Sequence, residues 1–255
     1  MTFEVLHQVA RWLGCQKIEL AECGSTNDEA ARLARMGAKH GTVVIADAQK
    51  SGRGRDGRLW ASPPGGLYLS AVLRPPLPLV DVPPMTLAIG IGVCDAARTA
   101  GAAAVLKWPN DVLVGGRKLA GVLVEAQSQG NRLDAVIVGI GVNLDGALPD
   151  DLAERAVSLA EASGHSVDRS AFVASLLGSV ERWVDRYIAS GLEAIIPAWQ
   201  DRMAVGLSAR ATIDGAPLVG AVAGLDHDGS LLLRDDDGNL HRVRSGDVEV
   251  LRPAC

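Results

Sequence analysis

The sequence is poor in cysteine, and its cysteines form no pattern that suggests a metal site. The 255 residues include four cysteines, none of which forms a C-x2-C pair or lies near a histidine at the spacing of zinc ligands. A zinc-binding domain is therefore not expected. Buried or incidental free thiols are the simpler interpretation of Cys15, Cys23, Cys94 and Cys255.

The sequence also lacks an excess of positive charge. Lys and Arg together number 25, whereas Asp and Glu number 30, which gives a net charge of −5. A protein that binds nucleic acid over its whole surface needs a positive net charge. Any site for an anion must therefore be local.

Two kinds of apolar segment are missing as well. The N-terminus carries Glu4 and no basic run ahead of an apolar core, so it does not resemble a secretory signal. We expect no apolar stretch that reaches the roughly 18 residues of a membrane span. We therefore expect a cytoplasmic protein that has no membrane partner.

The sequence does contain enough apolar material for a core. Hydrophobic residues make up 48% and charged residues 22% of a chain that is longer than a usual domain of roughly 100–200 residues. Beyond residue 205, short strands with turn signals at Asp214-Gly215, Asp228-Gly229 and Asp237-Gly238 favour a small β-barrel. We predict two domains, 1–204 and 205–255.

Local patterns predict the main elements of the first domain. Amphipathic periodicity predicts helices at 3–13, 172–189 and 192–203. Capping and proline signals predict two more helices, one that begins after Ser25 and one that begins after Pro84. Runs of β-branched or apolar residues predict strands at 18–21, 42–47, 67–73, 111–114, 119–126 and 133–142, with a loop at 50–66.

The predicted loop contains a literal G-x-G-x-x-G pattern, from Gly52 to Gly57. In a dinucleotide-binding turn this pattern runs straight into a helix whose N-terminus faces the pyrophosphate. Here it is followed by W-A-S-P-P-G-G at 60–66, which cannot form that helix. The context therefore excludes a dinucleotide-binding turn.

The same loop is locally basic. Lys50, Arg53, Arg55 and Arg58 stand against Asp56 alone, a local charge of +3 in a chain that is negative overall. Glycines allow backbone N–H groups to approach a phosphate, and arginine side chains offer paired donors to its oxygens. A solvated turn is the alternative, but the interleaved glycines favour an anion-binding loop.

A second cluster of chemically active residues follows at 107–111 (K-W-P-N-D) and 117–121 (R-K-L-A-G). Lys118 alone could be a lysine at the edge of a sheet, with its stem on apolar surface and its charge in water. Gly121, inside the same strand, suggests that another group packs closely there. The pattern G-I-G-V-N at 139–143 is weak support for a nearby ligand.

Five motifs in order resemble those of biotin protein ligases. They are S-T-N-D at 25–28, Q-K-S-G-R-G-R-D-G-R-L-W at 49–60, K-W-P-N-D-V at 107–112, R-K-L-A-G-V-L-V-E at 117–125 and G-I-G-V-N at 139–143. The resemblance covers about residues 15–145, and the C-terminal β module fits the family in position and size. Asp56 departs from the pattern, because many relatives carry a basic or neutral residue there.

The resemblance implies a fold and an activity. The fold is α+β, with a mixed, mainly antiparallel sheet, flanking helices and a small C-terminal SH3-like β-barrel. The activity joins biotin to ATP, with Mg²⁺, to form biotinyl-5′-AMP, and then transfers biotin to one lysine of a biotin carboxyl carrier domain, for example that of acetyl-CoA carboxylase. Only 24 residues precede Ser25, so we expect a monofunctional ligase that binds no DNA, as a monomer or weak homodimer.

The resemblance also assigns roles to residues. Lys118, Arg55 and Asp111 are the expected catalytic residues, and Asp111 either holds Mg²⁺ or positions the acceptor lysine. The expected biotin-binding residues are Ser25, Thr26, Asn27, Gln49, Arg53, Gly54, Arg55, Lys118 and Gly121. The expected ATP- or adenylate-binding residues are Arg53, Arg55, Arg58, Trp60, Lys107, Asn110, Lys118 and Asn143.

Elementary electrostatics explains why such a reaction needs cations. The first step brings a carboxylate to a phosphate, and two unit charges about 4 Å apart repel by about 4 kcal/mol at an effective dielectric near 20. Two other functions remain open. One is a ligase for lipoate or a medium-chain acid, from which Ser25, Thr26 and Gln49 distinguish a biotin enzyme. The other is a nucleic-acid-binding regulator, against which the net charge argues.

Overall fold

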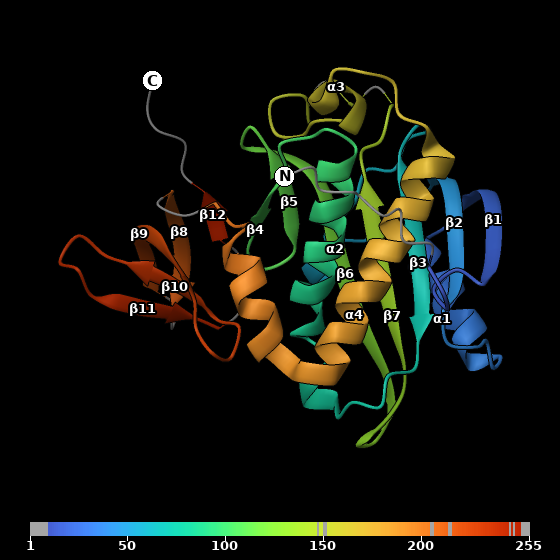
Figure 1. Cartoon of the computed structure of the whole chain (residues 1–255), viewed down its shortest axis with the longest axis horizontal. Coiled ribbons are helices and arrows are strands. Elements are labelled where there is room, and N and C mark those ends of the chain that lie inside the picture. The colour runs from blue at the N-terminus through green and yellow to red at the C-terminus, as the bar shows by residue number, and fades with distance from the viewer. Residues whose placement is uncertain are drawn as a thin grey trace, which may run out of the picture.

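The computed structural model describes residues 10–146, 148–149, 152–204, 207–213, 216–244, 246 and 248–250. Its centre is a seven-stranded sheet with the order β1-β2-β3-β7-β6-β5-β4 (Figure 1). Only the β1–β2 pair is parallel among these strands, and the other pairs are antiparallel. The sheet is therefore mixed and mainly antiparallel, as predicted.

The strands agree with the apolar runs of the sequence. They are β1 (Gln16–Cys23), β2 (Thr42–Gln49), β3 (Leu67–Leu73), β4 (Val105–Lys107), β5 (Asp111–Val114), β6 (Arg117–Gln129) and β7 (Arg132–Val142). Every residue of β3 is buried, because helices cover both faces of the sheet at that point. A strand that is covered on both faces has a sequence that is apolar almost throughout.

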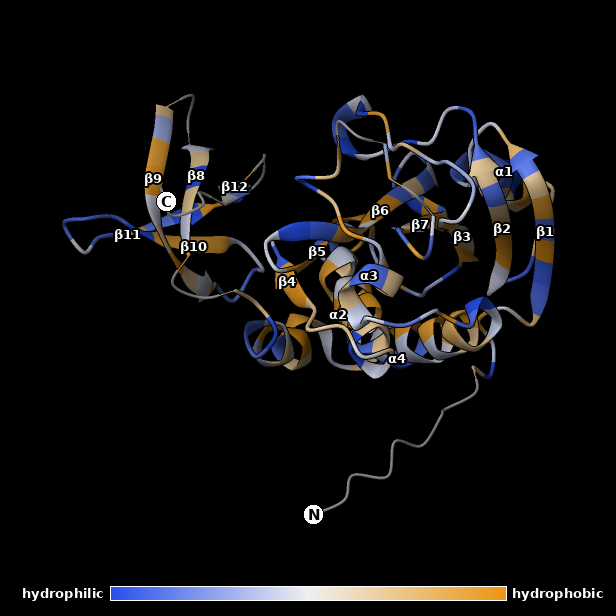
Figure 2. Ribbon diagram, turned by 90° about the horizontal axis from the view of Figure 1, so that it is seen from above, coloured by the Kyte–Doolittle hydropathy of each residue, from blue (hydrophilic) through white to orange (hydrophobic). Residues whose placement is uncertain are grey.

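Neighbouring strand residues face opposite layers. Val44 and Val72 pack with Ala30 and Ala34 of α1 (Thr26–Arg35) on one face of the sheet. Val43 belongs to the larger core on the other face, where α2 (Met85–Thr99) and α4 (Arg169–Gln200) lie side by side (Figure 2). This alternation follows from the two-residue period of a strand.

Two predicted helices of the sequence form one element. The segments 172–189 and 192–203 were expected to be separate, whereas α4 runs from Arg169 to Gln200 with a break at Gly191. Gly191 has φ 59° and ψ −154°, a backbone conformation open to glycine. Of the helix predicted at 3–13, residues 3–9 lie outside the described residues, and residues 10–13 form no helix.

One expectation about apolar segments needs correcting. The helical segment Leu79–Thr99, which includes η2 (Leu79–Asp81) and α2, is long and apolar enough by length and composition to cross a membrane. In the structure, 61% of its 18-residue window is buried inside the protein. The helix packs against α4 and the sheet, so the apolar residues are those of a core helix.

The C-terminal strands form a second, antiparallel sheet with the order β11-β10-β9-β8-β12. They are β8 (Ser208–Ile213), β9 (Ala216–Leu225), β10 (Leu231–Arg234), β11 (Leu240–Val243) and β12 (Val248–Val250). No pairing between the described parts of β11 and β12 closes this sheet. An SH3-like barrel is therefore not confirmed, and the observed unit is an open five-stranded sheet.

Two of the three predicted turns of this module are present. Asp228-Gly229 lies between β9 and β10 and Asp237-Gly238 lies between β10 and β11, whereas 214–215 lie outside the described residues. The Trp108 indole N–H donates to the Gly229 carbonyl at 3.0 Å, which joins the module to the turn between β4 and β5. The boundary near residue 205 falls on 205–206, outside the described part, so the division into 1–204 and 205–255 stays a prediction.

Candidate active site

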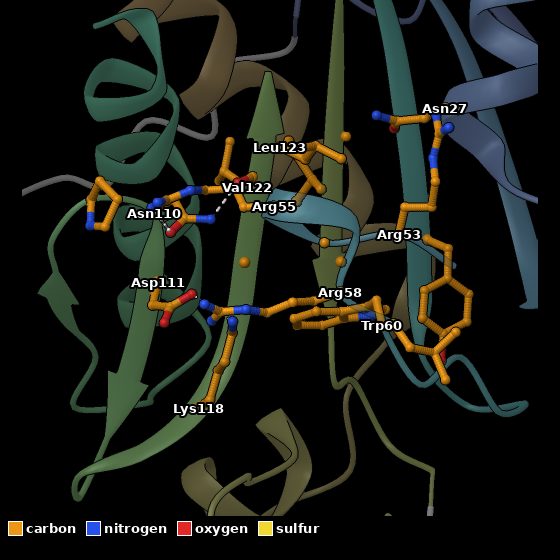
Figure 3. Close-up of a pocket in the computed structure, with 18 of the residues that line it drawn as sticks. Asn27, Arg53, Arg55, Arg58, Trp60, Asn110, Asp111, Lys118, Val122 and Leu123 are labelled. Atoms are coloured by element: carbon orange, nitrogen blue, oxygen red, sulfur yellow. Dashed lines mark hydrogen bonds and ion pairs between the residues drawn. The ribbon is translucent and has the colours of Figure 1, made fainter. Parts of the chain in front are cut away.

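A cavity of about 490 Å³ opens between the start of α1, the basic loop and the strands β5, β6 and β7. Fourteen of the fifteen predicted site residues line it, and Figure 3 labels some of them, among them Asp111 and Lys118. They are Ser25, Thr26, Asn27, Gln49, Arg53, Gly54, Arg55, Arg58, Trp60, Lys107, Asn110, Asp111, Lys118 and Gly121. The structure thus brings together motifs that are up to about 100 residues apart in the sequence.

One end of the cavity carries a network of neutral polar groups. The Gln49 carbonyl oxygen accepts from the Thr26 backbone N–H at 2.8 Å and from its hydroxyl at 3.1 Å, and the Gln49 amide donates to Ser62 Oγ at 2.8 Å. Behind these residues, the fully buried Ser70 lies 2.8 Å from Thr26 Oγ1 and 2.5 Å from Asn27 Oδ1. Strand β3 thus supports the first turn of α1.

Ser25 is the N-cap of α1, as its sequence pattern predicts, but its side chain makes no capping hydrogen bond. The residue is only 3% exposed and lines the cavity. A cap hydroxyl usually accepts from a backbone N–H of the first turn. At this helix the hydroxyl is not engaged in a cap, which leaves it available to a molecule in the cavity.

The floor of the cavity is made of glycines on β6 and β7. Gly121 and Gly141 are directly paired in the sheet, and the Trp60 ring lies on both. A Cβ at Gly141 would lie 2.6 Å from Trp60 Cε2, and one at Gly121 would lie 3.0 Å from Cζ3. The close approach inferred from Gly121 is therefore real, and the group that approaches is the Trp60 side chain of the basic loop.

Two lysines converge on one buried carboxylate. Lys118 Nζ lies 2.6 Å from Asp111 Oδ1, and Lys107 Nζ lies 3.1 Å from Asp111 Oδ2. The first contact has the distance of a close ion pair. The same Lys118 ammonium lies 5.0 Å from the centre of the Trp60 ring, within cation–π range.

The environment of Asp111 keeps it ionised. Asp111 is 8% exposed, and burial by itself would raise its pKa. The positive charges of Lys118 and Lys107 outweigh burial and leave the pKa of Asp111 below its ordinary value. The three residues therefore form a charged cluster with a net charge of +1 beside the cavity.

The basic loop folds back over the cavity. It contains one 3-10 turn, η1 (Arg55–Gly57), in which Asp56 has a positive φ of 54°. Arg55 donates to Asn110 Oδ1 at 3.2 Å and to the Gly246 carbonyl at 3.1 Å, so it links the loop to the turn before β5 and to a residue just before β12. Arg53 lies 2.8 Å from Asp28 Oδ1. The two arginines thus reach toward different ends of the cavity (Figure 3).

Asn143 is the predicted site residue that does not line this cavity. Its amide donates to the backbone carbonyls of Lys118 at 3.1 Å and Val157 at 3.3 Å. Its own backbone N–H donates to the Leu119 carbonyl at 2.9 Å. These contacts fix the backbone at Lys118, and the expected role of Asn143 in ATP or adenylate binding stays a prediction.

Sequence reasoning missed several residues of the site. Ser70 and Glu125 are polar interruptions of apolar strands, and that signal could have identified both. Tyr68 lines the cavity and donates to the Pro63 carbonyl at 2.7 Å, and burial raises its pKa to about 12. Val248 and Glu249 come from β12, and no local pattern places that strand beside the basic loop.

Comparison with known proteins gives a consistent result. Residues 24–143 match the model of the biotin/lipoate A/B protein ligase family, and residues 210–251 match the biotin protein ligase C terminal domain. A biotin--[acetyl-CoA-carboxylase] ligase from Paracoccus denitrificans is 38% identical over 232 residues, which cover 86% of this chain and 94% of that protein. The chain belongs to the biotin protein ligase family.

Other relatives of this ligase family agree. The bifunctional ligase/repressor BirA of Bacillus spizizenii is 36% identical over 232 residues, which cover 89% of this chain and 71% of that protein. A solved biotin protein ligase from Aquifex aeolicus, in complex with biotin and ATP, superposes with a TM-score of 0.80 at 29% identity. That match covers 94% of this chain and 100% of the other. The ligase fold thus extends over nearly the whole chain.

Proposed function

We propose that the protein activates biotin with ATP and transfers the biotinyl group to one lysine of a biotin carboxyl carrier domain, such as that of acetyl-CoA carboxylase. One observation carries this proposal: a single cavity joins a neutral polar end, at Thr26 and Gln49, to a cationic end, at Lys118 and Arg55. A polar head group, an acid and a nucleotide phosphate need this combination. The names of the relatives and the biotin and ATP of the Aquifex aeolicus complex support it.

In the first step, a carboxylate oxygen of biotin attacks the α-phosphorus of ATP. A new P–O bond forms, the bond to the β-phosphate oxygen breaks, and pyrophosphate leaves with the electron pair. Lys118, Arg53 and Arg55 supply positive charge around this position, where two anions must meet. Fixed cations in a partly dry site stabilise such a transition state because they need no reorganisation as it forms.

In the second step, the amine of the acceptor lysine attacks the acyl carbon of the adenylate. The new C–N bond forms as the bond to the AMP oxygen breaks, and the amine loses a proton to the surroundings. Asp111 is a poor base for this proton, since its pKa is lowered. Its fixed negative charge instead holds ammonium groups in place, and we propose that role in preference to proton removal.

The residues present do not fit a protein-held Mg²⁺ at Asp111. Both oxygens of this carboxylate already contact lysine ammonium groups. Among the described residues, no group of three His, Cys, Asp or Glu side chains could hold a metal ion. Magnesium in phosphoryl chemistry keeps several waters and is bound largely by the nucleotide phosphates, so we assign no residue of this chain to it.

Further parts of the proposal rest on sequence resemblance. We propose a cytoplasmic enzyme, monomeric or weakly dimeric, that modifies a carrier domain and does not act on DNA. The match of residues 210–251 to the biotin protein ligase C terminal domain supports an SH3-like module at 205–255. Pairing of β11 with β12 is the additional contact that such a barrel needs.

A direct assay tests the activity and separates it from that of a lipoate ligase. The purified protein is incubated with ATP, Mg²⁺ and either biotin or lipoate, and the acyl-adenylate is identified by mass spectrometry. We expect biotinyl-AMP and pyrophosphate with biotin, followed by a single biotinylated lysine when a carrier domain is added. Lipoyl-AMP in the absence of biotinyl-AMP would overturn the proposal.

A further inference from the structure

A carboxylate outside the predicted motif roles connects the neutral end of the cavity to the basic loop. Glu125 Oε2, on β6, accepts from the Asn27 amide nitrogen at 2.7 Å and lies 3.4 Å from Arg53 Nη2. Its side chain is 40% exposed. One oxygen atom therefore contacts both the first turn of α1 and a loop arginine, whose guanidinium lies beside Asn27 in Figure 3.

The two ends of the Asn27 amide have different neighbours. Its nitrogen faces Glu125, while its oxygen lies 2.5 Å from the Ser70 hydroxyl. An ionised carboxylate can only accept a hydrogen bond, so the amide NH₂ must face Glu125. A hydroxyl both donates and accepts, so Ser70 tolerates either orientation of the amide. Glu125 alone selects the orientation.

The sheet holds the amide where it is. A Cβ at Gly139 would collide with Asn27 Oδ1, so the oxygen end packs directly on the backbone of β7. With the oxygen on Ser70 and one N–H on Glu125, the second N–H remains for the cavity that Asn27 lines. Asn27 thus offers a donor to the cavity. Reversal of the amide would offer an acceptor instead.

We infer that Glu125 is a positioning residue that sets the hydrogen-bond polarity of the neutral end of the cavity through Asn27. The inference rests on the proposed function and specifies how this end recognises its ligand. A cyclic urea head group carries a carbonyl oxygen that needs a donor. Glu125 selects for such a carbonyl by keeping the N–H of Asn27 directed at it. It contacts no substrate atom itself.

The test is the affinity of the purified full chain for biotin without ATP, measured by calorimetry. Glu125→Gln replaces one acceptor oxygen by a donor and permits reversal of the Asn27 amide. We expect this variant to bind biotin about tenfold more weakly, because a partly buried hydrogen bond is lost or opposed. Glu193→Gln, the same charge change at an exposed position of α4, is the matched control and should bind like wild type.

Two further variants separate an effect of the hydrogen-bond polarity at Asn27 from a purely structural effect of the contact. The double variant Asn27→Asp with Glu125→Gln keeps a hydrogen bond between the two positions with donor and acceptor exchanged. We expect the double variant to have the Tm of the wild type and to bind biotin no better than Glu125→Gln does. Asp28→Asn removes the shorter contact of Arg53 without touching Asn27, and it should weaken biotin less than Glu125→Gln does.

The outcomes distinguish this inference from the proposed function. A wild-type chain that does not bind biotin overturns the function itself. Wild-type binding with unchanged affinity in Glu125→Gln overturns only the inference. The inference also fails if the double variant regains full affinity, which would mark the pair as structural. It fails as well if Asp28→Asn weakens biotin as much as Glu125→Gln, which would place the effect on Arg53.

Discussion

Lys118 and Asp111 form an ion pair of 2.6 Å on neighbouring strands at the edge of the cavity. The pair holds the ammonium group beside the Trp60 ring, 5.0 Å from its centre. A long lysine side chain would otherwise sample many rotamers, and holding it in place costs side-chain entropy. The carboxylate therefore acts by fixing a positive charge where the proposed chemistry needs it.

Lys118→Ala should suppress adenylate formation while leaving the chain folded. Loss of one fixed charge at the reacting centre should lower the rate of biotinyl-AMP formation by roughly 10²–10³-fold. Pyrophosphate release in the presence of biotin measures the rate, and a thermal melt checks the fold. Lys39→Ala, at an exposed lysine, is the control. Wild-type activity in Lys118→Ala with a normal melt would contradict the assigned role.

Arg55→Gly should leave adenylate formation possible but release the product early. Arg55 joins the basic loop to Asn110 and to the Gly246 carbonyl. Its removal should therefore release the loop from its position over the cavity. Loss of such charge-assisted hydrogen bonds should speed escape of biotinyl-AMP by roughly 10–100-fold. Biotinylation of an unrelated bystander protein measures the escape, with Arg35→Ala as the control. Normal retention of the adenylate would show that Arg55 does not hold the loop.

Glu181→Gln should destabilise the fold, and the loss should depend on pH. The buried Glu181 carboxylate of α4 accepts the backbone N–H groups of Arg11, Trp12 and Leu13 at 2.7–3.0 Å. Burial by itself would raise the pKa of Glu181, but the three backbone hydrogen bonds outweigh it and lower the pKa. An amide has one acceptor oxygen and no charge, so we expect a loss of about 1.5–3 kcal/mol at pH 7.

The pH dependence of this loss follows from linkage. Because the pKa in the folded state is below the ordinary value of 4.5, the carboxylate contributes its full stability above pH 4.5. That contribution disappears as the pH falls toward the lower, folded-state pKa. The difference in free energy of unfolding between wild type and Glu181→Gln should therefore be constant above pH 4.5 and shrink below it. A difference that grows in acid would contradict the assignment.

Gly92→Ala should destabilise the core. Gly90→Ala, two residues earlier on the same helix, should not. A Cβ at Gly92 would lie 2.8 Å from the Val180 Cα of α4, so the helices must move apart. Overpacking of this kind costs about 1–3 kcal/mol. At Gly90 the nearest atom would be 3.6 Å away, and alanine favours the helix. Urea unfolding of both variants measures the difference, and equal stabilities would contradict the α2–α4 contact.

Much of the fold follows from local sequence. The runs rich in β-branched or apolar residues at 42–47 and 67–73 predicted strands, and the structure has β2 and β3 there, buried along most of β2 and along all of β3. The proline signal before Met85 predicted the start of α2. Local patterns do not show that β1 lies parallel to β2 or that β12 ends beside the basic loop, since strand order depends on contacts far apart in sequence.

The candidate site also has one part that could be predicted from the sequence and one part that depends on the tertiary structure. Lys118, Arg53, Arg55 and Asp111 could be named as candidates because their motifs resemble those of biotin protein ligases, whereas residue type and spacing alone indicated only an anion-binding loop. Asn143 could not be placed, since its amide turns to the Lys118 carbonyl only once β7 is paired with β6. Glu125 gained its role from the tertiary structure, which brings it within hydrogen-bond distance of Asn27, 98 residues away.

The sequence by itself determined which charges and donors this ligase has and in what order they occur. The tertiary structure decided which of them face one another, because a hydrogen bond or ion pair acts over a few ångströms that only the register of the strands can set. Gly121 illustrates both levels: the absence of a side chain is a property of the sequence, and the Trp60 ring that uses the space is a property of the fold.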